Sequence, residues 1–481
     1  MKLIELTRRL PGGFTIYGDK NTEIIGLCTD SRSVCKGGLY FCIVGMHSDA
    51  HDFAPQMQQN GAAALVVERR LDVDLPQICV HNVREAMSYI AAAYYGFPSD
   101  RLRLIGITGT KGKTTTSFML KSILEAAGHK TGLIGTVCTL IGDTELEAGK
   151  TTPDPVEFQK ILSQMADAGV EYAVMEVSAH ALDMHRIDGV RFACAGFTNL
   201  SQDHLDYFGS MDKYLEAKLL ISSMTDSISV NVDDERVAKA FEARGIPFIR
   251  VGIREKASLY AKQIDMTESG ADFTLTFHNR ASCRVSLKMS GLFNVYNALM
   301  ASSLADSAGI PLEYIKAGLE RITRVPGRVE LLQTHTPYRV ILDYAHSPDA
   351  LENILTTLRQ STKKRLICVF GCGGGRDKGK RPIMGEISGR LADLSVVTSD
   401  NPRDEEPLEI IREIETGIKA VTDSYIIIEN RREAIKYALE TASSGDTVVL
   451  AGKGHETYQE IKGVKHPFDE KIVVRELLEE I

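Results

Sequence analysis

One stretch, Leu104–Ser117, restricts what this chain of 481 residues can fold into more than any other. An apolar run leads into a turn with glycines at positions 106, 109 and 112, and Lys113 and Thr114 follow directly. From Phe118 onward apolar residues recur at helical spacing. A strand, a glycine-rich loop and a helix in this order wrap backbone N–H groups around a phosphate, with the lysine on the β- and γ-phosphates and the threonine on Mg²⁺. The residues predicted to bind a nucleoside triphosphate are Gly109, Thr110, Lys111, Gly112, Lys113, Thr114 and Thr115.

The glycine spacing of this loop departs from the commonest pattern. G-x-x-x-x-G-K-S/T would place a glycine at position 107, where this chain has Ile107. The alternative interpretation is a tight strand-to-helix turn with an incidental lysine. Three glycines, a lysine and a run of threonines in the right order favour the phosphate site.

Composition indicates a soluble protein of several domains. A chain of this length exceeds what one hydrophobic core organises, so we expect two to four domains. The formal charge of −8 and the lack of a long Lys/Arg run argue against a nucleic-acid surface. No apolar stretch approaches the roughly 20 residues of a membrane span, and the first residues lack the apolar core of a signal peptide. We therefore expect a cytoplasmic protein.

Nine cysteines are scattered through the chain. Cys28, Cys35 and Cys42 lie seven apart in apolar, strand-like settings. Cys368 and Cys372 lie four apart without a second ligand pair nearby. Reduced core thiols are favoured over a zinc site.

Apolar runs alternate with helical patterns through three parts of the chain, which predicts an α/β fold. Residues 1–98 predict a small α/β domain, and residues 99–325 a central P-loop ATPase-like domain with a parallel sheet. Residues 326–481 predict a doubly wound, Rossmann-like sheet. Gly96–Asp100 and Arg324–Arg328 are the predicted linkers.

Polar residues follow two buried-type strands of the central part. Tyr172–Val177 contains Glu176, and Phe192–Phe197 is followed by a polar loop with His204. Ligands gather at the carboxyl ends of strands in open α/β sheets, and Mg²⁺ takes one or two carboxylates plus phosphate oxygens. Glu176 is therefore the first candidate metal ligand, with a solvated strand end as the alternative. His204 is as well explained by helix capping or hydrogen bonding.

Two further patterns remain open on chemistry alone. Lys218 lies late in a helical pattern and is most simply a solvated helix lysine. Asn294 and Asn297 share one face of a long helix, where asparagine is usually a cap but could contact a base edge. The loops Thr29–Ser33 and Gly45–His51 could hold a sugar or nucleotide, or serve only as turns.

Four polar loops follow strands of the last part: Asp343–His346, Gly371–Pro382, Ser399–Arg403 and Ala451–Glu456. At one sheet edge they would make one binding face. The basic cluster from Arg376 to Arg381 adjoins a strand end, which favours an anionic ligand over a solvated surface run.

Taken together, these segments resemble the Mur ligase family of bacterial cell-wall synthesis, and among its members the type that adds the third residue to UDP-N-acetylmuramoyl-L-alanyl-D-glutamate. The resemblance spans the whole chain and rests on Thr108–Thr115, Met175–Ser178, Thr198–Asp206, Asp343–His346, Asp377–Pro382 and Asp400–Arg403.

The resemblance implies an amide-forming reaction in which ATP phosphorylates a carboxylate and an amine then displaces phosphate. It implies that Thr114, Glu176 and His204 surround two Mg²⁺ sites, with Lys113 as a catalytic cation. It reverses the simple interpretation of Lys218, which matches the family's carbamylated lysine and would supply oxygen to Mg²⁺. Asn294, Arg328 and Asp343 match positions associated with ATP.

For the UDP-muramoyl dipeptide, the family pattern points to Ser31, His47, Thr151, Thr152, Ser178 and Arg186. The chain departs from that pattern at Met184, where relatives carry a polar residue such as glutamine. A direct hydrogen bond to substrate is not expected there.

The resemblance also concerns the incoming amino acid. Asp400, Asn401, Pro402 and Arg403 form a motif typical of relatives that add meso-diaminopimelate, whose second carboxylate an arginine can bind bidentately. Arg381, Gly452 and Glu456 match the other amino-acid contacts.

Lysine or another diamino acid is the alternative substrate. A folylpolyglutamate synthetase, or a P-loop switch without ligase activity, is the alternative function. We expect a monomer that binds small molecules only.

Overall fold

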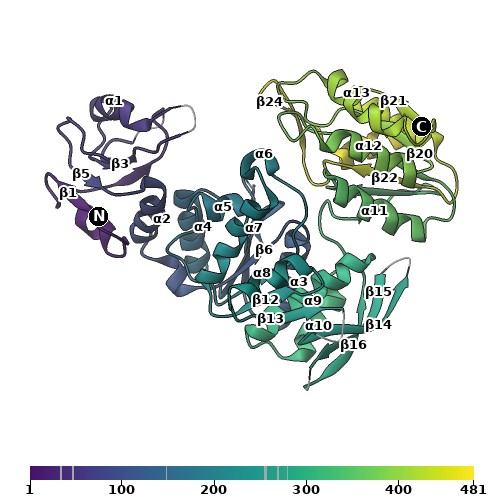
Figure 1. Cartoon of the computed structure of the whole chain (residues 1–481), viewed down its shortest axis with the longest axis horizontal. Helices are drawn as coiled ribbons and strands as arrows, with labels where there is room; N and C mark the ends of the chain where they lie inside the picture. The colour runs from purple at the N-terminus through teal and green to yellow at the C-terminus, as the bar shows by residue number, and fades with distance from the viewer. Residues whose placement is uncertain are drawn as a thin grey trace.

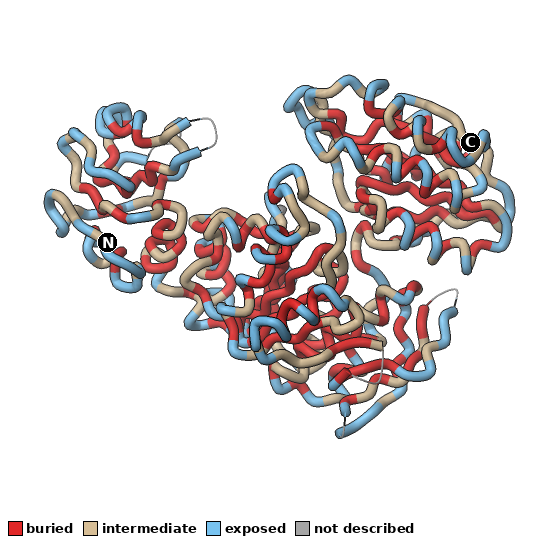
Figure 2. The backbone as a smooth tube through the Cα atoms, in the orientation of Figure 1, coloured by how far each residue is buried: buried red, intermediate tan, exposed pale blue. Residues whose placement is uncertain are grey.

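The computed structural model describes residues 1–32, 35–45, 48–147, 149–253, 257–267, 270–278 and 280–480. Three large sheets follow one another along the chain, with five, eleven and six strands. Figure 1 shows them as three bodies in a row, with the N-terminal part in purple, the central part in teal and the C-terminal part in green to yellow. Buried strands form the centre of each body (Figure 2). The predicted α/β architecture of three domains is confirmed.

The first sheet has the order β1-β5-β4-β3-β2, and only the β1–β5 pair is antiparallel. Its strands are β1 Thr15–Tyr17, β2 Gly26–Cys28, β3 Gly38–Phe41, β4 Ala64–Val67 and β5 Gln77–Cys79. The helices are η1 Leu3–Thr7, η2 Ala50–Phe53, α1 Ala54–Gln59, α2 Val83–Tyr94 and η3 Pro98–Arg101. Asn82 starts α2 by accepting hydrogen bonds from Arg84 N and Glu85 N. Ser88 Oγ on α2 donates to His185 O, which ties this body to the central one.

The central sheet has the order β16-β15-β14-β13-β12-β11-β6-β10-β7-β8-β9. Its strands are β6 Arg103–Thr108, β7 Thr131–Ile134, β8 Cys138–Ile141, β9 Thr144–Glu147, β10 Tyr172–Glu176, β11 Cys194–Phe197, β12 Ile228–Asn231, β13 Ile249–Gly252, β14 Leu259–Thr267, β15 Gly270–Phe277 and β16 Ser282–Leu287. The pairs from β7 to β14 are parallel, as predicted. Antiparallel strands extend this parallel sheet at both ends, with β8 and β9 at one end and β15 and β16 at the other.

Helices cover both faces of the central sheet. They are α3 Lys113–Ala126, α4 Pro155–Asp167, α5 Ala179–Asp183, α6 Leu205–Phe208, α7 Met211–Leu219, η4 Leu220–Met224, α8 Glu235–Ala243, α9 Leu292–Ser307 and α10 Leu312–Arg321. One core cluster packs α3, α9 and α10 against the sheet, and a second packs α4, α7 and α8. No helix in the described part of the chain is both long and apolar enough to cross a membrane.

The third sheet has the order β17-β18-β22-β19-β20-β21, and only β17–β18 is antiparallel. Its strands are β17 Glu330–Leu331, β18 Arg339–Asp343, β19 Leu366–Phe370, β20 Leu394–Val397, β21 Tyr425–Ile427 and β22 Thr447–Ala451, and β23 Tyr458–Ile461 and β24 Val464–Pro467 form a separate hairpin. The helices are α11 Pro348–Ser361, α12 Lys380–Leu391, α13 Pro407–Ile418, α14 Arg431–Thr441 and α15 Glu470–Glu480. Helices α11, α12 and α13 cover one face, and α14 and α15 the other, so the sheet is doubly wound as predicted.

All nine cysteines are free thiols, and most are buried as predicted. Cys79 and Cys283 are half-buried, and Cys35 is exposed and lies outside the strands. The sequence pattern of three cysteines seven apart did not distinguish it from its two buried neighbours.

Candidate active site

The phosphate loop joins β6 to α3, and its backbone needs glycine at two positions. Gly109 and Gly112 have φ angles of 138° and 84°, in the region that favours glycine. A Cβ at Gly109 would lie 2.0 Å from Thr198 Oγ1, and one at Gly112 would lie 2.3 Å from Asn297 Oδ1. The irregular spacing of the glycines therefore follows from close contacts with β11 and α9.

Residues after β11 hold the loop in place. Asn199 Oδ1 accepts a hydrogen bond from Lys111 N at 2.9 Å, and Asn199 Nδ2 donates to Lys111 O at 3.0 Å. Thr198 Oγ1 donates to the same carbonyl at 2.7 Å. Sequence reasoning placed these residues beside the site but did not assign them this support of the loop, since no spacing rule predicts it.

Two lysines point at the carbonyl side of the loop. Lys113 Nζ donates to Gly109 O and Thr110 O at 2.8 and 2.9 Å, and Lys218 Nζ donates to Gly109 O at 2.8 Å. Burial lowers the pKa of Lys113 to about 8. Burial, reinforced by the charge of Lys113, lowers the pKa of Lys218 well below its usual value. Lys218 is only 1% exposed, so the solvated helix lysine inferred from chemistry alone is wrong.

Glu176 ends β10 beside the loop, and three donors fix its buried carboxylate. Thr114 Oγ1 donates to Glu176 Oε2 at 3.0 Å. Thr136 contributes its N–H to Oε1 at 2.9 Å and its hydroxyl to Oε2 at 3.0 Å. The alternative of a solvated strand end is wrong, because Glu176 is 1% exposed. Thr136 follows an apolar strand without any motif, and sequence reasoning missed it.

His204 precedes α6 with a left-handed backbone, φ 55°. Its ring packs edge-on against His180, with centroids 4.7 Å apart, and burial lowers its pKa to about 4. The neighbouring Asp203 pairs with Lys111 at 3.2 Å. Burial acts to raise the pKa of Asp203, but Lys111 and His204 more than offset it and lower that pKa far below its usual value. Burial thus favours the neutral form of the His204 imidazole.

The predicted ATP residues from distant parts of the chain line one cavity of about 450 Å³ between the central and C-terminal bodies. Asn294, Arg328 and Asp343 face it together with Lys111, Gly112 and Thr115. Asn297 Nδ2 donates to Asn294 Oδ1 at 3.1 Å, so these two amides orient each other. Asp343 Oδ2 accepts from Val329 N at 2.8 Å, and burial raises the pKa of Asp343.

Two contacts connect the C-terminal body to the phosphate loop and its surroundings. Arg328 Nη2 donates to Thr114 Oγ1 at 3.2 Å, and the Arg328 guanidinium lies 4.9 Å from the centre of the Tyr344 ring. The imidazole of His455 bonds to the backbone of Thr136. Both contacts end on residues that also bind Glu176, so Glu176 lies beside the junction of the two bodies.

Most residues predicted to bind the dipeptide lie together beyond the end of β10. Thr151 Oγ1 lies 3.0 Å from Thr136 Oγ1, and Thr152 Oγ1 donates to Glu176 O at 2.8 Å. Thr152 Oγ1 also accepts from Ser178 N at 3.1 Å, and Arg186 Nη1 donates to Thr152 O at 3.2 Å.

The remaining residues predicted for this substrate lie in other places. Ser31 lies in the N-terminal body, where it hydrogen-bonds with Tyr40. His47 lies outside the described residues. Met184, where the chain departs from the family pattern, receives a contact from Arg186 Nη2 at 3.5 Å on its sulfur. That sulfur therefore supports the arginine rather than offering a strong hydrogen bond.

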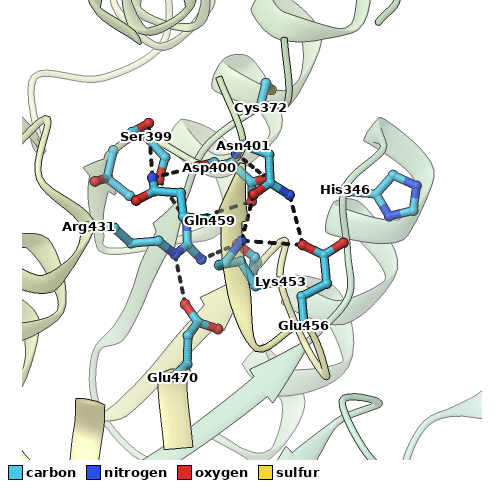
Figure 3. A network of polar contacts seen from close by, with 12 residues as sticks. His346, Cys372, Ser399, Asp400, Asn401, Arg431, Lys453, Glu456, Gln459 and Glu470 are labelled. Carbon is cyan, nitrogen blue, oxygen red and sulfur yellow. Dashed lines mark hydrogen bonds and ion pairs between the residues drawn. The ribbon is translucent and has the colours of Figure 1, made fainter. Parts of the chain in front are cut away.

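The loops that follow β20 and β22 form a buried polar network (Figure 3). Asn401 Nδ2 donates to Glu456 Oε2 at 2.8 Å, and Tyr344 OH donates to Glu456 Oε1 at 3.3 Å. Asp400 Oδ1 accepts from Asn401 N at 2.7 Å. A Cβ at Gly452 would lie 2.6 Å from Asp400 Oδ2, so glycine there leaves room for the aspartate.

Arg403 lies at the rim of the same network. Its backbone is left-handed, φ 52°, and follows Pro402, whose carbonyl accepts from Glu405 N at 3.0 Å. Arg403 Nε donates to Glu460 Oε2 at 3.0 Å and Nη1 to Gly374 O at 2.7 Å.

Arg381 lies deeper and is fully buried. Its Nη1 donates to Glu405 Oε2 at 3.0 Å and to Glu413 Oε2 at 2.8 Å, and its Nη2 donates to Glu405 Oε1 at 2.9 Å. Its predicted contact with the amino acid would therefore need these ion pairs to rearrange.

Comparison with known proteins agrees with this geometry. The family model "Mur ligase family, catalytic domain" matches residues 23–95, "Mur ligase middle domain" residues 107–305, and "Mur ligase, glutamate ligase domain" residues 327–454. The chain is 46% identical to UDP-N-acetylmuramoyl-L-alanyl-D-glutamate--2,6-diaminopimelate ligase 1 of Clostridium acetobutylicum, over 97% of each chain. The chain belongs to the Mur ligase family.

Other relatives of this Mur ligase match over its full length. The UDP-N-acetylmuramoyl-L-alanyl-D-glutamate--2,6-diaminopimelate ligase of Geobacillus kaustophilus is 44% identical over 100% of both chains. A solved structure of a UDP-N-acetylmuramoyl-L-alanyl-D-glutamate--2,6-diaminopimelate ligase has a TM-score of 0.69 at 31% identity, covering 100% of this chain and 99% of that one. MurF from Acinetobacter baumannii, at 22% identity and a TM-score of 0.68 over 99% and 98% of the two chains, shares the fold.

Proposed function

We propose that this Mur ligase joins meso-diaminopimelate to UDP-N-acetylmuramoyl-L-alanyl-D-glutamate at the cost of ATP. One observation carries the proposal: Arg328 of the C-terminal body bonds to Thr114 of the phosphate loop, whose hydroxyl also bonds to Glu176. This contact joins the proposed triphosphate loop to the domain that carries the proposed amino-acid loops, and Glu176 also bonds to Thr136, which lies 3.0 Å from Thr151 of the proposed dipeptide residues. That is the arrangement an ATP-driven condensation needs.

The proposed reaction has two steps. An oxygen of the substrate's terminal carboxylate attacks the γ-phosphorus of ATP, forms an acyl phosphate and releases ADP. The neutral amine of the amino acid then attacks the acyl carbon, and the tetrahedral intermediate expels inorganic phosphate and loses a proton. A carboxylate is a poor electrophile, and the phosphate becomes its leaving group, so catalysis rests on positioning and charge neutralisation. We assign that neutralisation to Lys113 in the phosphate loop.

The residues around Glu176 fit Mg²⁺. In the described part of the chain no group of three His, Cys, Asp or Glu side chains forms a ready metal site, which suits an ion that takes most ligands from phosphates and water. Thr114 and Glu176 would hold one ion, with His204 and a carbamylated Lys218 beside a second. Bound Mg²⁺ would neutralise charge on the phosphates. Burial of Lys218 supports the carbamate, because CO₂ reacts with the neutral amine and the pKa of Lys218 is strongly lowered.

We propose that the three domains divide the substrates. Residues 1–98, with Ser31 and His47, would bind the UDP-sugar, residues 99–325 would bind ATP, and residues 326–481 would bind the amino acid. Thr151, Thr152, Ser178 and Arg186 would bind the peptide end of the UDP substrate beside the γ-phosphate. We also propose a monomer that works in the cytoplasm.

For the amino acid, we propose that Arg403 binds the distal carboxylate of diaminopimelate and Glu456 an ammonium group. Lysine has no such carboxylate and would leave the arginine with one partner fewer in a closed site. We propose that Arg381, which is bonded to Glu405, supports the loop around Gly373 and Arg403.

The test of the proposed function is an omission experiment. ADP and phosphate should form at a useful rate only when ATP, Mg²⁺, the UDP-muramoyl dipeptide and diaminopimelate are all present, with one amide formed for each ADP. ATP hydrolysis that ignores the dipeptide and the amino acid would refute a ligase and favour a nucleotide switch.

A further inference from the structure

Lys453 is a buried cation in the amino-acid network for which the reaction described above has no role. Its side chain is fully buried between the loops that follow β20 and β22 (Figure 3). Lys453 Nζ donates to Asn401 Oδ1 at 3.0 Å and lies 3.3 Å from Glu456 Oε2. A buried ammonium is costly unless it is paired, so these two contacts must repay its desolvation.

The lysine fixes which way the Asn401 amide faces. Asn401 Oδ1 accepts from Lys453 Nζ and also from Glu460 N at 2.9 Å, while Nδ2 donates to Glu456 Oε2. A flipped amide would turn its N–H₂ group toward two donors and its oxygen toward a carboxylate. Lys453 therefore secures the single orientation in which Asn401 can hold Glu456.

The lysine also balances the charge of two carboxylates. Asp400 is buried, and its Oδ2 has no hydrogen bond among the described residues. Burial acts to raise the pKa of Asp400, but the charges of Lys453 and Arg431 outweigh it and lower that pKa. Arg431 is matched by Glu470, whose Oε1 accepts from Arg431 Nε at 2.8 Å. Arg431 Nη1 also lies 3.9 Å from Asp400 Oδ2, so Lys453 is the one of these two cations whose carboxylate partner, Glu456, lies inside the site.

We propose that Lys453 is the positioning residue of the amino-acid site, which orients Glu456 and Asn401 to receive the ammonium group of the incoming amino acid. This inference rests on the proposed function and extends it to a residue with no assigned role. Lys453 does not touch the reacting atoms. Its removal frees the Glu456 carboxylate on one side and removes one of the two cations whose charges lower the pKa of Asp400.

The first test replaces Lys453 by methionine, which has similar length and no charge. The KM for diaminopimelate should rise at least tenfold in Lys453→Met, while the KM values for ATP and the UDP-muramoyl dipeptide stay within about twofold. The matched control is Lys465→Met. Lys465 is exposed and shares with Lys453 only the ring of Tyr458, whose centre lies 4.1 Å from Lys465 Nζ and 5.9 Å from Lys453 Nζ. This variant should match the wild type, which also shows that the ring contact contributes little.

The second test is chemical rescue, which a merely structural lysine would not allow. In Lys453→Ala, added methyl-, ethyl- or propylammonium ions should lower the KM for diaminopimelate toward the wild-type value, and neutral alcohols of the same size should not. The melting temperatures of both variants report any general loss of folding.

Three outcomes decide between the explanations. Unchanged KM for diaminopimelate in Lys453→Met overturns this inference alone, provided the wild type uses diaminopimelate. Equal losses for all three substrates, with no rescue by ammonium ions, also overturn it and indicate a structural role. Failure of the wild type to use diaminopimelate overturns the proposed function together with the inference.

Discussion

At the residue scale, Lys218 has the environment least expected from its place in the chain. Nothing in the pattern of α7 separates it from a solvated lysine, yet it lies 4.7 Å from the centre of the Tyr214 ring and bonds to Gly109 O. Burial beside the cationic Lys113 favours a neutral amine. A neutral amine near the phosphate loop is the species that can become a carbamate.

Lys218→Ala should therefore lose turnover while keeping its fold. We expect kcat to fall by at least the roughly 10–100-fold that loss of an outer partner of a metal ligand costs. A short-chain carboxylic acid such as propionate should restore part of it by occupying the space of the carbamate. Lys213→Ala, on the same helix but exposed, is the control. Activity unchanged in Lys218→Ala rules out the carbamate.

Residues with a motif could be predicted at this scale, and residues without one could not. Lys113, Thr114 and Glu176 follow from a loop pattern and from the rule that ligands lie at strand ends. Thr136, which makes two of the three bonds to Glu176, lies in a turn with no signal in its neighbours. The burial of Lys218 depends on how α7 packs under the phosphate loop, which helical periodicity does not reveal.

At the element scale, two neighbouring arginines join α14 to α15, and one is buried while the other is partly exposed. Arg431 Nε donates to Glu470 Oε1 at 2.8 Å, and both side chains are fully buried. Arg431 also donates to Ala451 O at 3.0 Å and Ser399 O at 3.4 Å, at the ends of the loops that carry Asp400 and Gly452. Arg432 bonds to two glutamates of α15 that are about half exposed.

The neighbouring pairs should differ sharply in their effect on stability. Glu470→Ala leaves a buried guanidinium uncompensated and should lower the free energy of unfolding of the C-terminal domain by about 3–5 kcal/mol. Arg432→Ala removes exposed pairs and should cost about 0–1 kcal/mol. Urea unfolding followed by circular dichroism measures both. Equal costs for the two variants would contradict the burial of the Arg431–Glu470 pair.

The ion pair between Arg381 of α12 and Glu405, in the loop after β20, should make the stability of the fold depend on pH. Hydrogen bonds from Arg381 lower the pKa of Glu405 to about 2, against an ordinary value of 4.5. Because the pKa of Glu405 is lower in the folded state than in the unfolded one, ionised Glu405 stabilises the fold above pH 4.5. This contribution is lost as the pH falls toward 2. Wild type should exceed Glu405→Gln in unfolding free energy at pH 7, with a gap that narrows between pH 4.5 and pH 3. A gap that stays constant over that range contradicts the assignment.

Elements with strong periodicity were the most predictable. Leu366–Phe370 and Leu394–Val397 are strands with the predicted bounds, and the helix predicted over residues 211–220 is α7. The antiparallel strands β15 and β16 and the hairpin β23–β24 were not predicted, because alternating strands at a sheet edge resemble polar loops in composition. Strands β15 and β16 extend the central sheet at one end, and Glu460 on the separate hairpin bonds to Arg403.

At the scale of the whole molecule, the cavity proposed to hold ATP belongs to two bodies at once. Its lining joins Lys111 and Asn294 of the central domain to Arg328 and Asp343 of the next. Bound nucleotide should therefore link the central and C-terminal domains without affecting the first sheet. The order of the three bodies was predictable from the apolar runs, but which faces meet was not, because the meeting residues lie far apart in the chain.

Hydrogen exchange with and without Mg²⁺ and a non-hydrolysable ATP analogue tests this link. Protection should rise in residues 109–112 and also in residues 328–329 and 343–354, by up to roughly 100-fold at a ligand concentration of 100 times Kd. Residues 64–79 of the first sheet should not change. The Lys113→Met variant, with a damaged phosphate loop, should show none of these effects. Protection confined to the central domain would contradict a shared cavity.

Phosphate release is the most direct test of whether this ligase selects meso-diaminopimelate. With ATP and the UDP-muramoyl dipeptide fixed, kcat/KM should be compared for diaminopimelate isomers, lysine and ornithine, in the wild type and in Arg403→Ala. We expect kcat/KM for meso-diaminopimelate to exceed that for lysine by roughly 10³-fold or more, since a site built for a polar group rejects an analogue that lacks it. Arg403→Ala should lose most of that preference. Equal turnover of lysine and meso-diaminopimelate by the wild type would contradict the account.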